Sequence, residues 1–116
     1  MSIQQKTGNY GESKAIEYLE ANDYLVIFRN FRYKRGEIDI IARKGELLVF
    51  VEVKTRRSEA YGFPEESIDD KKIEMIRATA EGYCEANKWL GPIQFDIISI
   101  ISNKQTFELE HFEDAF

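Results

Sequence analysis

The stretch from residue 36 to residue 56 constrains the fold of this chain more than any other. It holds two runs rich in β-branched and other apolar residues, 37–43 and 46–55, separated only by Lys44-Gly45. Two such runs around a two-residue turn predict a β-hairpin. With Lys44-Gly45 as the turn, Asp39 lies opposite Phe50 in the expected register.

The rest of the chain extends this hairpin into an α/β pattern. A capping-box pattern at 67–70 predicts the start of a second helix, and Gly91-Pro92 follows its end. Apolar periodicity predicts, in order, a helix at 7–22, strands at 24–31, 37–43 and 46–55, a helix from 67–70 to 88, and strands at 93–101 and 106–112. The order α, β, β, β, α, β, β predicts a mixed sheet flanked by helices.

Length and composition limit the classes of protein to which the chain can belong. Its 116 residues predict one domain spanning residues 1–116. A hydrophobic content of 43% excludes intrinsic disorder. A single cysteine, Cys84, excludes an internal disulfide and a cysteine-ligated zinc site, and we treat it and the single His111 as structural. No apolar run approaches the roughly 20 residues of a membrane span, so we expect a cytoplasmic protein without membrane contact.

Charge is distributed unevenly along the chain. The whole chain has 16 basic and 21 acidic residues, a net charge of −5. Residues 29–57 nevertheless contain nine basic residues and four acidic ones. A local basic segment of this kind can attract phosphate although the total charge is negative.

Three charged residues of the predicted hairpin share one face of the sheet. Because side chains alternate along a strand, Glu52 and Lys54 lie on the same face as Phe50 and its partner Asp39. In this register Asp39 and Glu52 are diagonal neighbours, about 7 to 8 Å apart. Two carboxylates at that spacing can hold one divalent cation, with the lysine beside it.

The first predicted helix contributes a further carboxylate. Glu12 lies on the same helical stripe as Ala15, Ile16 and Leu19, so it faces the protein rather than solvent. A buried, unpaired carboxylate costs several kcal/mol or shifts its pKa upward. Glu12 therefore requires a partner: a metal, a lysine or the polar face of the sheet.

Carboxylates with a lysine and without histidine indicate a particular chemistry. Hard oxygen ligands select Mg²⁺ or Mn²⁺, which bind phosphoryl oxygens and activate water. Surrounding arginines would then hold the backbone of a nucleic acid. The simpler alternative is a half-exposed strand, on which a Glu-x-Lys pair contributes only about 0 to 1 kcal/mol.

The motifs of the chain resemble those of the YraN family, within the PD-(D/E)XK nuclease superfamily. The strings GEIDIIA at 36–42 and LVFVEVKTR at 48–56 carry the resemblance. Shorter strings extend it over nearly the whole chain: GNYGE at 8–12, RNFR at 29–32, Lys72 with Thr79-Ala80, FDI at 95–97 and DAF at 114–116.

The resemblance implies an αβββαβ core like that of restriction endonucleases and archaeal Holliday-junction resolvases. It implies that Asp39, Glu52 and the backbone carbonyl of Val53 bind the metal, that Lys54 is the catalytic lysine, and that Glu12 matches the acid of the first helix. Ile38 stands where the superfamily name has proline, a position that varies within the superfamily.

Several other residues are candidates for binding nucleic acid. They are Arg56 and Arg57 after the hairpin, Arg32 and Arg35 before it, and Lys72 in the second helix. Pairing with surface glutamates, or plain solvation, is the alternative for each of them. Tyr61 and Phe63 could stack on bases or only anchor their loop, and Asp96 in an apolar strand is expected to accept hydrogen bonds in the core.

These observations predict a Mg²⁺- or Mn²⁺-dependent nuclease that hydrolyses phosphodiester bonds in structured or branched DNA rather than RNA. Its alternative is a nucleic-acid-binding module of a DNA repair or recombination complex that cuts slowly or not at all. A third class is a purely structural interaction domain. Analogy with resolvases, which are often dimers, suggests a homodimer.

Overall fold

A computed structural model describes residues 3–56, 68–102 and 106–116. Its elements are helix α1 (Ile3–Ala21), strands β1 (Leu25–Tyr33), β2 (Gly36–Lys44) and β3 (Leu47–Arg56), helix α2 (Asp70–Ala86), and strands β4 (Ile93–Ser102) and β5 (Phe107–Phe112). Their order is the predicted one. Within the described residues, no helix is long and apolar enough to cross a membrane.

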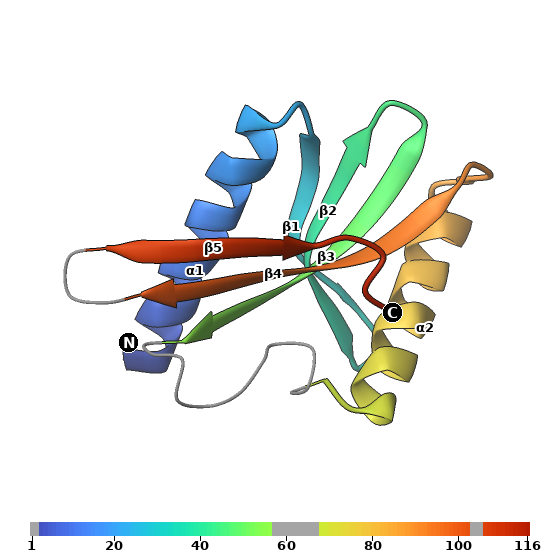
Figure 1. The fold of residues 1–116 in the computed structure, drawn as a ribbon. Helices are drawn as coiled ribbons and strands as arrows, with labels where there is room; N and C mark the ends of the chain where they lie inside the picture. Colours follow the sequence, from blue (N-terminus) through green and yellow to red (C-terminus); the bar gives the residue numbers. More distant parts are fainter. Residues whose placement is uncertain (1–2, 57–67, 103–105) are drawn as a thin grey trace.

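The described strands form one mixed sheet in the order β1-β2-β3-β4-β5 (Figure 1). Strands β3 and β4 are parallel and α2 lies between them in sequence, whereas the other neighbouring pairs are antiparallel. A parallel pair requires a crossover connection, which α2 provides. The predicted α/β fold is confirmed, and it is consistent with a restriction-endonuclease-like core.

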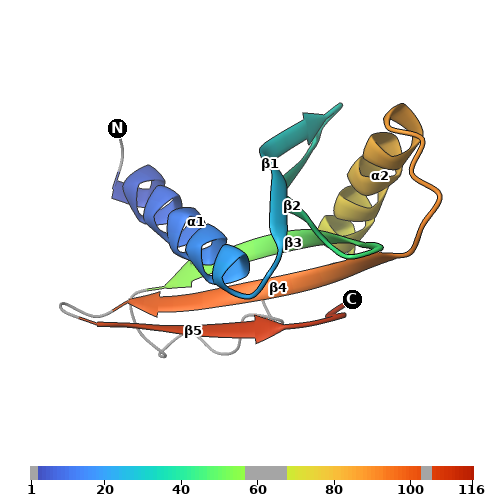
Figure 2. The same cartoon turned by 90° about the horizontal axis from the view of Figure 1, so that it is seen from above.

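The β1–β2 end of the sheet rises between the two helices, with α1 on one side and α2 on the other (Figure 2). Each side has its own apolar core. On the α1 side, Leu19 packs with Ile40 and Val51. On the α2 side, Tyr83 packs with Ile41 and Phe50. Because both faces of the central strands are covered, apolar residues run nearly continuously through β2 and β3.

The predicted register of the β2–β3 hairpin is wrong by two residues. Lys44 pairs with Leu47 and Ile41 pairs with Phe50, so the turn is Gly45-Glu46 instead of Lys44-Gly45. Gly45 has φ +60°, a left-handed conformation that glycine adopts without a steric penalty. Moving an antiparallel turn by one residue shifts the pairing by two, which leaves Ile41 on the predicted face together with Phe50.

The pairing of β2 with its two neighbours extends over different lengths. Its last pair with β3 is Ile40 with Val51, whereas its pairing with β1 continues to Gly36 with Tyr33. Beyond Ile40, β1 and β2 therefore form a two-stranded ribbon, and we use this name for residues 29–40. The ribbon packs against α2, where the Tyr33 ring covers Gly82.

The second helix begins later than predicted. Its N-cap is Asp69, whose carboxylate accepts a hydrogen bond from the backbone N–H of Lys72 at 2.9 Å. The predicted cap, Ser67, lies outside the described residues. Asp is as good an N-cap as Ser, because its side-chain oxygen also accepts a hydrogen bond from an otherwise unpaired N–H of the first turn.

The contact between Tyr33 and Gly82 predicts an unusual effect of alanine. Replacing glycine by alanine inside a helix normally stabilises a protein by about 1 kcal/mol. A Cβ on Gly82 would lie 2.6 Å from the Tyr33 ring, so Gly82→Ala should instead destabilise by about 1 to 3 kcal/mol in urea unfolding. In a Tyr33→Ala background the same substitution should cost nothing. A stabilised Gly82→Ala protein would contradict this packing.

Candidate metal centre

Asp39 lies where β2 separates from β3. Beyond the last β2–β3 pair, its carboxylate accepts the hydrogen bond that a backbone carbonyl would otherwise accept. The N–H of Val53 donates to Asp39 Oδ2 at 2.8 Å. A buried N–H needs an acceptor, and here a carboxylate supplies it. The half-buried Asp39 carboxylate is thereby fixed beside β3.

Glu52 brings a second carboxylate to the same place. Its side chain is only 8% exposed, and Lys72 Nζ of α2 approaches Glu52 Oε2 at 3.6 Å. Burial, together with the hydrogen-bonded and negatively charged Asp39, raises the pKa of Glu52 to about 8, although Lys72 and Lys54 act in the opposite direction. Glu52 therefore keeps its proton to a higher pH than an exposed glutamate does.

Glu12 approaches from α1. Gly11 lets the helix come close to β3, since a Cβ there would collide with the Thr55 side chain. Burial and the nearby Asp39 raise the pKa of Glu12, and Asn30 and Arg29 only partly offset them. Arg29 stands 3.8 Å from Glu12 Oε1, yet this buried oxygen has no hydrogen-bond partner among the described residues.

Two lysines complete the group. Lys54 follows Glu52 on the same face of β3, and Lys72 lies in the first turn of α2. Both line an open depression together with Asp69, Lys71 and Met75. Of the sequence candidates, the structure therefore places Glu12 near Asp39, and Lys54 and Lys72 near Glu52, with Asp39 and Glu52 beside each other.

The predicted arginines are more scattered. Arg32 lies on the ribbon, 78% exposed, with its Nε 3.7 Å from Glu37. Arg35 is exposed at the ribbon turn and faces a depression that α2 lines with Glu81 and Glu85, away from the carboxylates. Arg56 is half-buried at the end of β3. Arg57, Tyr61 and Phe63 lie outside the described residues.

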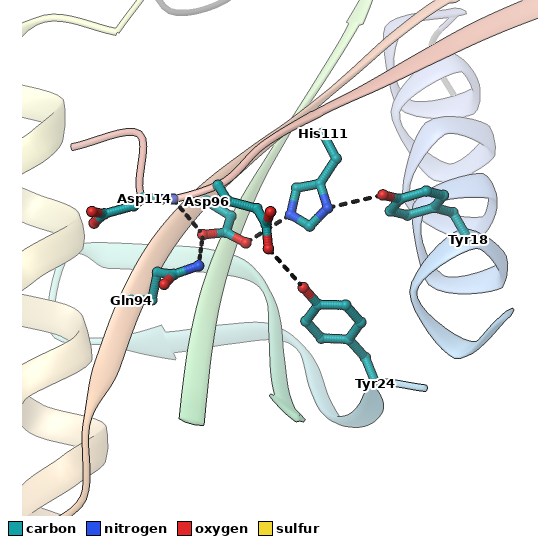
Figure 3. Close-up of polar contacts among 7 residues, drawn as sticks. Tyr18, Tyr24, Gln94, Asp96, His111 and Asp114 are labelled. Carbon is teal, nitrogen blue, oxygen red and sulfur yellow. Dashed lines mark hydrogen bonds and ion pairs between the residues drawn. The ribbon is translucent and has the colours of Figure 1, made fainter. Parts of the chain in front are cut away.

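A second polar group lies around Asp96, which is fully buried (Figure 3). Its carboxylate accepts hydrogen bonds from Gln94 Nε2 at 3.0 Å and from the Asp114 N–H at 3.0 Å, and it contacts His111 Nε2 at 2.7 Å. The other ring nitrogen of His111 meets the Tyr18 hydroxyl at 3.0 Å. Asp96 does accept hydrogen bonds in the core, as predicted, and the contacts tie β5 to β4 and α1.

The ligand atoms of Asp96, His111 and Glu113 lie within 4.8 Å of one another, close enough to hold one metal ion. Hydrogen bonds already occupy them: Asp96 has the donors above, and the Tyr24 hydroxyl donates to Glu113 at 3.5 Å. At Glu12, by contrast, a buried oxygen lacks a donor. Sequence patterns do not predict the group around Asp96, because its members come from separate segments of the chain.

Comparison with known proteins places the chain in a family. The model of the Uncharacterised protein family UPF0102 matches residues 11–100. The chain belongs to this family. A UPF0102 protein of Persephonella marina is 46% identical over 110 residues, covering 94% of this chain and 91% of the relative. One of Christiangramia forsetii is 37% identical over 116 residues, covering 100% and 98%. The resemblance to the YraN family is confirmed, since UPF0102 is that family, and the nuclease superfamily is consistent with it.

Asn30 lies at the site of this UPF0102 protein but is not among the site residues predicted from the sequence. It lies next to Glu12, and its φ of +56° is left-handed. Two features of the sequence draw attention to it: asparagine is uncommon within a strand, and Asn30 belongs to the RNFR string at 29–32.

The raised pKa of Glu52 predicts how stability depends on pH. Between the ordinary value of 4.5 and about 8, the folded protein binds a proton that the unfolded chain releases, so stability without metal should fall as pH rises through this window. Glu52→Gln should remove this fall, a relative gain of at least about 1 kcal/mol, or roughly 4 to 8 °C in Tm, near pH 9. Thermal unfolding with a chelator at pH 5 and 9 measures it. Exposed Glu46→Gln is the matched control, and a parallel fall in both variants would refute the shift.

Proposed function

We propose that this UPF0102 protein is a Mg²⁺- or Mn²⁺-dependent nuclease that hydrolyses phosphodiester bonds in structured or branched DNA. The observation that carries the proposal is the convergence of Glu12, Asp39 and Glu52 beside two lysines. Asp39 of β2 lies where the sheet splits, and its negative charge disfavours the charged forms of Glu12 of α1 and Glu52 of β3. A divalent cation among them would relieve that repulsion.

The donors present fit a hard divalent cation. Asp39, Glu52, Glu12 and the backbone carbonyl of Val53 are oxygen ligands of the kind that Mg²⁺ and Mn²⁺ prefer. The unpartnered Glu12 Oε1 is free to accept such an ion. When bound, the ion would polarise a phosphoryl oxygen and lower the pKa of bound water. Binding would also displace a proton from Glu52, whose pKa is raised to about 8.

The lysines have separate tasks in this proposal. Lys54, next to Glu52 on β3, is the catalytic lysine, whose ammonium stabilises charge that develops on the phosphate. Lys72 pairs with Glu52 at 3.6 Å and would turn toward substrate phosphate once a metal neutralises that carboxylate. Both line the same open depression, which leaves room for a phosphodiester.

Basic residues around the centre support binding to a nucleic acid. Arg32 lies on the ribbon with most of its side chain exposed, so it can exchange its contact with Glu37 for a phosphate. We assign the same role to Arg56, Arg57 and Arg35. The acidic α2 residues beside Arg35 make it the weakest of them.

A second function is favoured by the ion pairs already present. Arg29 and Lys72 partly neutralise Glu12 and Glu52 without any metal. A chain with a net charge of −5 could then act as a nucleic-acid-binding module of a repair or recombination complex, relying on a partner for affinity. Salt-dependent binding without metal-dependent cleavage would favour it.

The nuclease proposal predicts loss of cleavage without loss of fold. Asp39→Asn, Glu52→Gln and Lys54→Met should each reduce metal-dependent cleavage at least about 100-fold, because each removes a group that acts on the reacting phosphate. Labelled junction, flap, duplex and single-stranded DNA with Mn²⁺ or Mg²⁺ is the assay, and circular dichroism checks the fold. Arg43→Gln, on the far end of β2, is the control. Equal cleavage by parent and all three variants would show a contaminating nuclease and overturn the assignment.

Metal binding distinguishes the two acidic groups. Mn²⁺ at about 100 times its Kd should stabilise the parent by about 2.7 kcal/mol. Glu52→Gln should abolish this thermal shift, whereas His111→Gln should lower the Tm in the absence of metal but keep the shift. The reverse pattern would place the metal at Asp96, His111 and Glu113.

A further inference from the structure

The ribbon contains an irregularity directly beside the candidate metal centre. Arg29 pairs with Ile40 and Phe31 pairs with Ile38, which leaves Asn30 opposite Asp39. Asn30 has φ +56°, a conformation that L-residues other than asparagine and aspartate rarely adopt. The residue opposite the central carboxylate is thus the one with unusual backbone geometry.

In β1, the alternation of side chains between the two faces of the sheet breaks at Asn30. Phe28 and Phe31 are three residues apart, so in a regular strand they would face opposite sides. Their rings instead meet at 5.4 Å, and the Phe31 ring lies 5.3 Å from Tyr83 of α2. One residue between them is therefore inserted into the alternation.

The same change occurs in β2 at the same rung. Ile38 and Ile41, again three residues apart, both belong to the apolar core on the α2 side. Ile40, between them, belongs to the core on the α1 side. Both strands thus carry one additional residue at the rung of Asn30 and Asp39, like two β-bulges placed opposite each other.

This paired irregularity explains the direction of Asp39. In regular alternation between Ile38 and Ile40, its side chain would point squarely out of one face. The additional residue turns it instead along the sheet toward β3, where it accepts the Val53 N–H. The Asn30 side chain also lies close enough to the Glu12 carboxylate to act against the rise of its pKa.

We propose that Asn30 is a positioning residue of the metal centre: its left-handed backbone turns Asp39 toward Glu52, and its amide holds Glu12 beside them. The inference rests on the proposed metal site. It assigns to a residue of β1 control over ligands that come from α1, β2 and β3.

The same change of alternation also places basic residues of the ribbon on the side of α1, where Glu12 lies. Arg29 contacts Glu12 of α1. Arg32 precedes Tyr33, which covers Gly82 of α2, so by alternation Arg32 faces away from α2. Arg29 and Arg32, three residues apart, therefore share the α1 side. Glu37, the partner of Arg32, is two residues from Asp39, so Arg32 lies about 7 Å along the ribbon from the metal centre. At that distance it can reach the neighbouring phosphates of a bound nucleic-acid strand.

Substitutions of Asn30 separate its two roles. Glycine adopts a positive φ freely but has no amide, so Asn30→Gly keeps the backbone turn and loses only the contact with Glu12. Alanine loses both, since a left-handed conformation is unfavourable for it. Asn30→Gly should therefore weaken Mn²⁺ binding less than about fivefold, and Asn30→Ala should weaken it more than tenfold.

The experiment measures the Mn²⁺ dissociation constant of the full chain by electron paramagnetic resonance, with the Tm recorded in parallel. Lys34→Ala is the matched control, because Lys34 is another ribbon residue with positive φ, at +55°, but lies away from the carboxylates. It should lower the Tm and leave Mn²⁺ affinity unchanged. A merely structural Asn30 would behave in the same way as Lys34.

The possible results distinguish failure of the Asn30 inference from failure of the proposed function. A folded Asn30→Ala protein with the affinity of the parent would overturn the inference, and so would a folded Asn30→Gly protein that loses binding as fully as Glu52→Gln. If Asn30→Ala does not fold, Asn30→Gly decides alone, since near-parent affinity supports the backbone role. Absence of Mn²⁺ binding in the parent would instead refute the proposed function.

Discussion

The hydrogen bond from the Val53 N–H to Asp39 determines the arrangement of the candidate site. Strand pairing between β2 and β3 ends at Ile40 with Val51, and a side chain rather than a backbone carbonyl satisfies the next N–H of β3. A charged acceptor therefore lies inside the sheet, at the point where β2 and β3 separate. The group that completes the backbone bonding of β3 is therefore also the group that faces Glu52, so the fold and the proposed chemistry depend on one carboxylate.

Such a site costs stability when no metal is present. Glu52 is buried, its pKa is raised to about 8, and the nearby Glu12 is also destabilised as an anion. Lys72 and Arg29 reduce the cost, but neither lies within hydrogen-bonding distance of its carboxylate. A site built only for stability would contain apolar residues of similar size, since buried ion pairs rarely exceed them in stabilisation. Glu12 and Glu52 beside Asp39 are instead what the proposed metal site would require.

Sequence patterns predicted the order of helices and strands. The hairpin turn lies one residue later than predicted, and Ile41 still shares a face with Phe50 because an antiparallel register shifts in steps of two. The shared face predicted for Asp39 does not hold in the same way, because the alternation of β2 breaks at this residue. The change of alternation at Asn30 could not be predicted from the sequence. An additional residue in each of two paired strands leaves an apolar pattern that resembles that of an ordinary buried strand. The sequence also does not predict that Lys72 contacts Glu52, since this contact depends on how closely α2 packs against β3.

The two acidic groups of the molecule show why burial alone does not identify a metal site. Asp96 is completely buried, but Gln94, His111 and the Asp114 N–H surround its carboxylate, and each of its oxygens has a donor. A metal there would have to displace hydrogen bonds that already compensate for burial. Glu12 is less buried and yet retains an oxygen without a donor, next to two further carboxylates. At the proposed cation site, where β2 and β3 separate, the Glu12 oxygen would therefore have no hydrogen bond to give up.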